Sequence, residues 1–322
     1  FGSGKALSLG LNTSSTAKTA SISYTNPYFT PDGVSRGFDL YYRKTDPNQL
    51  QLGQYNTAAK GLAMRFGVPL TEYDFVSTSI GYERSEITLL TGAGGRYIDF
   101  VNTYGSRYDS IPGSISWVRD GRDSGFYPTR GALRRVALEA GLPGGDLNYY
   151  KLNLQQQWFY PLSKTFTFLF NAELGYGGGY NGKDMPFMLN YYAGGIGSVR
   201  GYQYASLGPK DLITGDPLGG DRRLVANSEL LFPMPGLKGD KSVRLSLFAD
   251  AGTVWGQEQY YDGTTIRYRE QKMDLSDLRY SAGFALGWTS PVGPLKFSIA
   301  QAIRPQDGDK VEKFQFTMGT MF

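Results

Sequence analysis

The segment TFTFLFNAELGY, from Thr165 to Tyr176, decides the fold class because its side chains alternate in character. Its even-numbered positions are all apolar or aromatic: Phe166, Phe168, Phe170, Ala172, Leu174 and Tyr176. Its odd-numbered positions include Thr165, Thr167, Asn171 and Glu173. Successive side chains of a β-strand point to opposite faces, so the segment predicts a strand with one apolar face and one largely polar face.

The same alternation recurs in Ser35–Lys44, Val243–Asp250 and Leu278–Thr289. The less apolar faces of these segments carry glycine, serine, threonine and single charges, which a dry sandwich core would exclude. An apolar skin against lipid, backed by a wet lumen, predicts this division. Aromatic residues gather near the expected strand ends, as in NPYF (Asn26–Phe29) and WFYP (Trp158–Pro161), which is typical of the interfacial girdles of membrane barrels.

Composition excludes several function classes. The chain has 322 residues with no Cys and no His, which removes disulfides, thiolate metal sites and the usual general base of hydrolases. Barrel proteases and phospholipases therefore fit poorly, and we expect no enzyme, no catalytic residue, no cofactor and no metal site. Lys and Arg number 33 against 29 Asp and Glu, a net charge of +4 without a basic block, so nucleic-acid binding gets little support.

About fourteen strands are expected. Their approximate centres are Leu9, Ile22, Leu40, Leu62, Ile80, Trp117, Leu138, Leu154, Phe170, Ser228, Leu247, Phe284, Phe297 and Phe316. Some links are short, such as Thr30–Val34, whereas Leu89–Pro112, Tyr180–Arg223 and Gly256–Asp277 are long, an asymmetry typical of outer-membrane barrels. We find no helical period, linker or domain boundary. The sequence thus predicts an all-β protein: one transmembrane antiparallel β-barrel, closed into a cylinder, over residues 1–322.

The chain ends FQFTMGTMF. One face of this last segment carries Phe314, Phe316, Met318, Thr320 and Phe322. An apolar closing strand with a terminal aromatic residue is the signal by which bacterial outer-membrane barrels are recognised and inserted, so we expect an integral protein of that membrane. Gly319 interrupts the strand near its end, where glycine weakens pairing and permits a bend.

The longest link contains GGIGSVRGYQYASLGP, Gly194–Pro209, with a single arginine among glycines and aromatic residues. The guanidinium group of Arg200 would bind carboxylates through two parallel hydrogen bonds. By alternation, Glu229 and Asp250 face the lumen on the next two strands, where a charge avoids lipid. We therefore expect this loop to fold back into the barrel, with Arg200 held by Glu229, Asp250 or both.

These motifs resemble the BamA family, whose members are the central subunit of the bacterial outer-membrane β-barrel assembly machinery. VRGY (Val199, Arg200, Gly201 and Tyr202) followed by SLGPK resembles the family's signature loop. The supporting stretches are TNPYFTPDGVS (Thr25–Ser35), GFYPTRG (Gly125–Gly131), NYYAGG (Asn190–Gly195), SVRLSLFADAGTVW (Ser242–Trp255) and RYSAGFALGWTSPVGPLKFS (Arg279–Ser298).

The resemblance implies insertion of other outer-membrane proteins without ATP or cofactor. It implies that Arg200 contacts the acids matching Glu229 and Asp250, and that the first and last strands pair weakly to form a lateral gate. Phe314–Phe322 would be the last strand and Gly319 its kink. The implied partners are unfolded outer-membrane protein clients, accessory assembly lipoproteins, periplasmic chaperones, and membrane lipid with lipopolysaccharide, but no nucleic acid.

The family barrel has sixteen strands, and FGSGK (Phe1–Lys5) aligns with the turn before the third. We therefore expect the first two strands, and the periplasmic POTRA domains that bind the lipoproteins, to be absent from this chain. Two alternatives remain open: a two-partner secretion or translocation transporter of the same superfamily, and a passive porin. Five POTRA-like modules upstream would favour assembly, two secretion and none a porin, and a large, steady current would also favour a porin.

Overall fold

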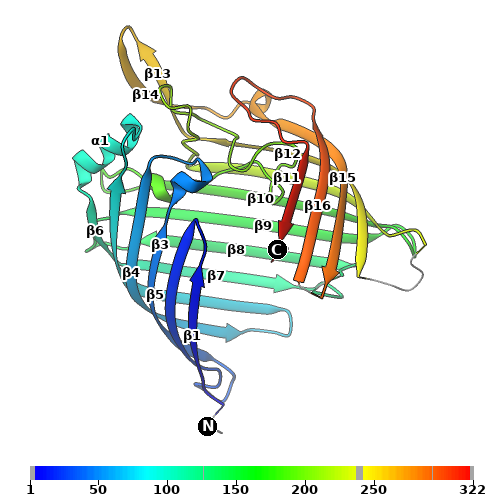
Figure 1. Ribbon diagram of the computed structural model, residues 1–322. Coiled ribbons are helices and arrows are strands. Elements are labelled where there is room, and N and C mark those ends of the chain that lie inside the picture. Colours follow the sequence, from blue (N-terminus) through cyan, green and yellow to red (C-terminus); the bar gives the residue numbers. More distant parts are fainter. Residues whose placement is uncertain (1–3, 126, 237–241, 292, 320–322) are drawn as a thin grey trace.

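The computed structural model describes residues 4–125, 127–236, 242–291 and 293–319. Fourteen of its strands follow one another as hydrogen-bonded antiparallel neighbours in one sheet, which curves into a barrel (Figure 1). In order along the sheet they are β1 (Ala6–Thr13), β2 (Ala17–Asn26), β3 (Ser35–Thr45), β4 (Tyr55–Pro69), β5 (Asp74–Leu89), β7 (Pro112–Asp120), β8 (Gly131–Gly141), β9 (Tyr149–Pro161), β10 (Thr167–Gly179), β11 (Arg222–Pro233), β12 (Val243–Trp255), β15 (Arg279–Ser290), β16 (Gly293–Ala302) and β17 (Phe314–Met318). Each expected strand centre falls within one of them, so the prediction of an all-β antiparallel barrel is confirmed.

The two faces of the sheet differ as the alternation predicts. On β10, Phe168 is 38% exposed on the outer face and Asn171 is 8% exposed on the inner face. On β12, Leu247 is 41% exposed and Asp250 is 2% exposed. The apolar side chains thus form the outer skin, and the polar ones line the lumen.

The long links hold the structure that alternation does not reveal. The short elements are η1 (Pro47–Leu50), α1 (Gly95–Tyr104), β6 (Arg107–Ser110), η2 (Phe187–Leu189), β13 (Gln257–Asp262), β14 (Thr265–Glu270) and η3 (Leu275–Asp277). Strand β6 pairs with β5 beside the main path of the sheet, whereas β13 and β14 form a separate hairpin. Figure 1 places that hairpin and α1 at the same end of the barrel.

Helix α1 contradicts the expectation that the chain contains no helix. Its apolar residues recur at helical spacing: Tyr97, Phe100, Val101 and Tyr104. The rings of Tyr97 and Phe100 pack on Phe187, with centroids 4.7 and 5.2 Å apart, and this aromatic contact stabilises a helix of only 10 residues. None of the helices in the described ranges has the length and apolar character needed to cross a membrane.

Strands β1 and β17 are the two ends of the sheet. Among the described residues, β1 pairs only with β2 and β17 only with β16. The expectation of a closed cylinder is therefore wrong for this part of the chain, because no backbone ladder joins the two end strands. The physical reason lies in the number of strands, since fourteen follow one another here where the family resemblance implies sixteen.

Candidate functional site

The stretch Gly194–Pro209, here called the signature loop, lies between β10 and β11 and folds into the lumen (Figure 1). Glycine is required at two points. Gly194 has φ of +106°, and a Cβ there would lie 2.4 Å from the carbonyl oxygen of Gln203. Gly201 has φ of +85°, and its Cβ would lie 3.1 Å from the Cβ of Ala300. These glycines let the loop turn tightly and lie against the barrel wall.

Arg200 is 1% exposed and is clasped by acids from two adjacent strands. Its Nε and Nη2 donate to Oδ2 and Oδ1 of Asp250, both at 2.7 Å, and its backbone N–H donates to the same carboxylate at 3.0 Å. Its Nη1 lies 2.8 Å from Oε1 of Glu229, an ion pair without the angle of a hydrogen bond. The guanidinium carbon also lies 3.5 Å from the ring centroid of Phe248. Asp250 is therefore the principal partner of Arg200, and Glu229 the second.

A chain of amide side chains fixes the carboxylate of Asp250. Asn227, directly across from Asp250 on β11, donates through Nδ2 to Oδ1 of Asp250 at 2.9 Å. The same amide donates to the carbonyl oxygen of Ser198 in the signature loop at 2.7 Å, and Asn171 on β10 donates to Asn227 at 3.0 Å. The acid that holds Arg200 is thus positioned by three neighbouring strands.

Apolar side chains of the signature loop pack next to this polar cluster. Val199, Tyr202 and Leu207 are each 0% exposed. They pack with Val225 of β11 and Val254 of β12 in one buried cluster. Burial of three side chains removes apolar area from water and anchors the loop independently of the ion pair.

The signature loop also bonds to the last strand. Gln315 on β17 donates through Nε2 to the carbonyl oxygen of Tyr202 at 2.7 Å, and its Oε1 accepts from the N–H of Gly201 at 3.3 Å. The N–H of Glu312 donates to the carbonyl oxygen of Gly201 at 3.0 Å. The loop therefore connects the wall formed by β11 and β12 to the end strand of the sheet.

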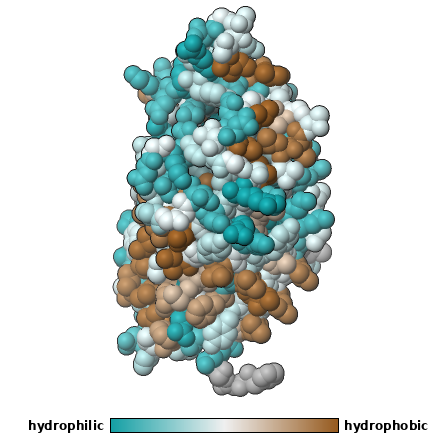
Figure 2. Space-filling model, turned by 90° about the vertical axis from the view of Figure 1, so that its left-hand side faces the viewer, coloured by the Kyte–Doolittle hydropathy of each residue, from teal (hydrophilic) through white to brown (hydrophobic). Residues whose placement is uncertain are grey.

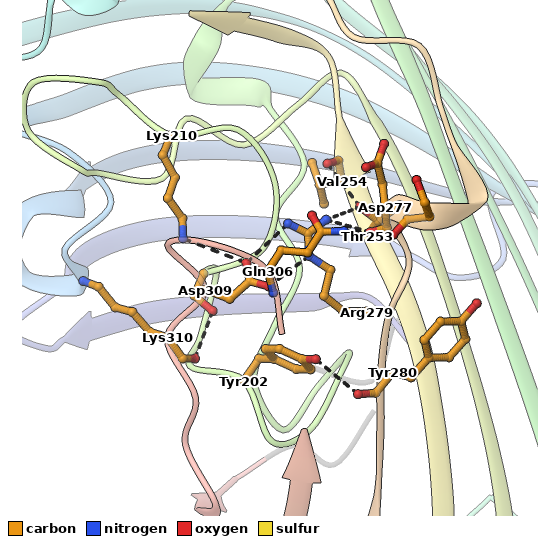
Figure 3. A network of polar contacts seen from close by, with 12 residues as sticks. Tyr202, Lys210, Thr253, Val254, Asp277, Arg279, Tyr280, Gln306, Asp309 and Lys310 are labelled. Atoms are coloured by element: carbon orange, nitrogen blue, oxygen red, sulfur yellow. Dashed lines mark hydrogen bonds and ion pairs between the residues drawn. The ribbon is translucent and has the colours of Figure 1, made fainter. Parts of the chain in front are cut away.

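A second ionic cluster fixes the links beside the signature loop (Figure 3). Nε of Arg279, the first residue of β15, donates to Oδ2 of Asp309 at 3.0 Å, and Nη1 donates to the carbonyl oxygen of Asp277 at 2.6 Å. Nζ of Lys210 lies 3.9 Å from Oδ1 of Asp309, whose side chain is 0% exposed. Burial lowers the pKa of Lys210, while the charge of Asp309 acts in the opposite direction. This cluster joins three links at the long-loop end of the barrel.

The expected gate strand ends earlier than the sequence suggested. Phe314, Phe316 and Met318 lie on the outer face of β17, 57%, 52% and 64% exposed. Gly319 follows the strand in a bend with φ of +120°, and its N–H still donates to the carbonyl oxygen of Pro294 on β16 at 3.0 Å. Phe322 lies outside the described residues.

A polar cavity of about 450 Å³ lies in the lumen beside the signature loop. Its lining includes Arg122, Arg135, Gln155, Glu173 and Lys296. In the ranges that the structure describes, no group of three or more acidic side chains is placed to hold a metal ion. The lumen is therefore a wet, charged chamber around an anchored loop.

The structure brings together the residues that the sequence selected: Val199, Arg200, Gly201, Tyr202, Glu229 and Asp250. Sequence reasoning did not find Phe248, Gln315 or the pair formed by Arg279 and Asp309. The position of Gln315 carried a signal, because it lies between two outward phenylalanines and must face the lumen. Its partner could not be read from the sequence, since no local pattern specifies which loop lies opposite a lumen residue.

The apolar skin, polar lumen and inward loop of this antiparallel barrel define an outer-membrane β-barrel with an anchored lumen loop. The family model described as "Omp85 superfamily domain" matches residues 1–322, and the chain belongs to this superfamily. The protein is an integral protein of the bacterial outer membrane, as the sequence predicted.

Two curated relatives carry the name "Outer membrane protein assembly factor BamA". The one from Neisseria meningitidis serogroup B is 41% identical, over 100% of this chain and 44% of the relative. The one from Nitratidesulfovibrio vulgaris is 28% identical, over 100% of this chain and 38% of the relative. The chain thus spans less than half the length of either relative.

A solved structure supports the same relationship. The chain superposes on the structure titled "The crystal structure of BamA from Haemophilus ducreyi lacking POTRA domains 1-3" with a TM-score of 0.88 and 29% identity. The match covers 98% of this chain and 64% of that one. The similarity to BamA drawn from the sequence motifs is therefore confirmed.

Proposed function

We propose that the protein containing this chain assembles β-barrel proteins into the outer membrane by pairing client strands with a weak lateral seam. In this proposal residues 1–322 form the transmembrane barrel domain, β17 forms one edge of the seam, and the signature loop braces that edge. The observation that carries the proposal is the short ladder of β17, which pairs with β16 over 5 residues and is bonded to the signature loop through Gln315.

The backbone of β17 indicates which groups do not bond to β16. Lys313 accepts a backbone hydrogen bond from β16 at 2.8 Å, and Gly319 donates one to the same side at 3.0 Å. Hydrogen-bonded and non-hydrogen-bonded positions alternate in an antiparallel pair. Phe314, Phe316 and Met318 therefore direct their N–H and C=O groups away from β16, toward the other edge of β17.

A weakly paired edge favours exchange with an incoming strand. Each backbone group left unpaired in the hydrocarbon core costs several kcal/mol, so an unpaired strand edge in lipid is unfavourable. A client strand that adds to this edge satisfies those groups by β-augmentation. In this proposal β17 makes few bonds along this edge because the strand is only 5 residues long, so exchanging them for pairing with a client lowers the barrier to insertion. This activity makes and breaks no covalent bond and requires no cofactor.

The signature loop supports this role because it contacts two separate parts of the barrel wall from inside the lumen. Arg200 attaches it to β11 and β12, and Gln315 attaches it to β17. The loop would maintain the curvature of the wall while the edge exchanges partners. Unfolded outer-membrane proteins are the proposed clients, and accessory lipoproteins and periplasmic chaperones are the proposed partners of the whole protein.

A proline substitution tests whether the edge is used. Phe316→Pro removes one free edge donor while leaving the ladder bonds to β16, a position where proline is tolerated in an edge strand. Phe316→Val is the control for loss of the ring, and Thr317→Pro is the control that removes a bond to β16. The readout is the rate at which a client barrel folds into vesicles containing the intact protein, followed by its heat-modifiable mobility on gels.

We expect Phe316→Pro to slow client folding while the variant barrel itself stays folded, and Phe316→Val to retain most of the rate. Thr317→Pro should destabilise the strand itself. Equal client folding by the proline and valine variants would contradict strand addition at this edge. A large, steady current through the intact protein in a planar bilayer, without client folding, would favour a passive porin.

A further inference from the structure

An open groove of about 630 Å³ lies on the outer side of β2–β5. Its lining includes Ile22, Leu40, Leu62, Met64, Ile80 and Tyr82. These side chains belong to the outward set, and Leu40 and Leu62 are 56% and 57% exposed. The groove is therefore a concave part of the skin that faces lipid.

A basic cluster lies directly beyond the groove along the same strands. The strand register places Tyr42, Lys60 and Arg84 side by side, one repeat beyond Leu40 and Leu62. One repeat on a strand face is two residues, about 7 Å. The next repeat pairs Lys18 with Lys44 and Glu86 with Arg107.

The side chains of these two repeats carry an excess of positive charge. They contain five basic residues, Lys18, Lys44, Lys60, Arg84 and Arg107, against two acidic residues, Glu86 and Asp109, a net charge of +3. A second recess of about 590 Å³ lies among Tyr42, Lys60, Arg84 and Arg107.

The lysines of this cluster are free to bind an anion. Arg84 forms an ion pair with Asp109 at 2.7 Å, and Arg107 forms one with Glu86 at 3.3 Å. Within the described ranges, the lysines of the cluster form no ion pair, and all three are exposed. Pairing fixes the two arginines, whereas the ammonium groups of the lysines lack counter-ions.

The cluster lies at the long-loop end of the barrel. The links beyond it are η1 with its flanking residues and the segment that holds α1. Long loops of outer-membrane barrels face the outside of the cell, so the cluster lies at the level of the outer-leaflet head groups. Figure 2 views this side of the barrel and shows hydrophobic residues in its lower half and again at its upper right, with mostly hydrophilic residues across the middle.

We propose that this face binds an outer-leaflet lipid whose head group carries phosphate. An acyl chain lies in the groove along Leu40 and Leu62, and the phosphate contacts Lys60, with Lys18 and Lys44 beyond it. The argument is charge complementarity, since phosphate is the anion that membrane lipids present at this height and ammonium groups donate well to it. Nothing in this site depends on the edge of β17, so it stands or falls separately from the proposed assembly function.

Native mass spectrometry of the intact protein in a zwitterionic detergent tests the proposal. The probes are diphosphorylated lipid A, the same lipid without its phosphates, phosphatidylcholine and inorganic phosphate. The test variant is the triple substitution Lys18→Gln, Lys44→Gln and Lys60→Gln. The control variant, Lys5→Gln, Lys164→Gln and Lys272→Gln, changes the net charge equally at exposed sites outside the cluster.

We expect the diphosphorylated lipid to bind more tightly than the other three probes. The test variant should weaken this binding about fivefold for each lysine removed, which is the expected effect of one basic residue at an anionic lipid surface. The control variant should bind like the original protein. Unchanged binding by the test variant, an equal loss in the control variant, or equal binding of the dephosphorylated lipid would overturn the site. Equal binding of inorganic phosphate would overturn the role of the groove.

Discussion

Replacing Arg200 with alanine should make the signature loop open more often without unfolding the barrel. The side chain of Arg200 is 2% exposed, and those of Asp250 and Glu229 are 0% and 9% exposed, so water screens these pairs weakly. Removing one partner of a buried ion pair costs about 3–5 kcal/mol, because the remaining charge stays buried without its counter-ion. At about 1.4 kcal/mol for each factor of ten, opening of the loop should become at least about a hundredfold more frequent.

Hydrogen exchange of the backbone amides measures this opening directly. Amides of Gly195 and Leu207, which bond within or beside the loop at 2.8 and 3.1 Å, should exchange at least about a hundredfold faster in Arg200→Ala. Arg200→Lys should fall between the two, because lysine keeps the charge and loses the paired geometry. Arg65→Ala is the matched control: Arg65 pairs with Asp39 elsewhere in the barrel, its side chain is 43% exposed, and it should leave the loop unchanged. Exchange in Arg200→Ala within threefold of the original protein would refute the reasoning.

Three further predictions follow from the same contacts. Asp250→Asn should increase loop exchange more than Glu229→Gln does, because Arg200 makes its aligned hydrogen bonds to Asp250; equal effects on exchange would show that the ion pair alone matters. Gln315→Ala should raise the protease sensitivity of the loop and of the segment before β17 together, since one amide joins them, and limited proteolysis would reveal whether only one region responds. Gly201→Ala should lower thermal stability more than Gly215→Ala: both glycines have positive φ, but only the first meets the barrel wall, so equal shifts in melting temperature would leave backbone strain as the whole effect.

The alternation of apolar and polar residues was sufficient to place all fourteen strands of the main sheet. Each strand needs this pattern, because a shift of one residue would turn its whole apolar face toward the lumen. The same pattern selected Glu229 and Asp250, because every second side chain of a strand faces inward. The pairing with Arg200 needed the further argument that a buried guanidinium group requires carboxylates. Local pattern and simple electrostatics thus predicted the centre of the site.

Alternation could not reveal features that arise from tertiary packing. Helix α1 forms in a long link and depends on Phe187, which is distant in the sequence. The bonds from Gln315 to Gly201 and Tyr202 join residues more than a hundred positions apart and become evident only in three dimensions.

The most direct test of the central proposal is disulfide trapping between β17 and a client strand during assembly. Cysteines placed singly at Phe314, Phe316 and Met318 would be combined with a cysteine scan of the client's last strand, with Phe168→Cys on β10 as an outward control. If client strands add to the edge of β17, cross-links should form with a constant register: moving two residues along β17 should move the preferred client position by two. Cross-links that are absent, lack this register, or form equally well at Phe168 would contradict the account.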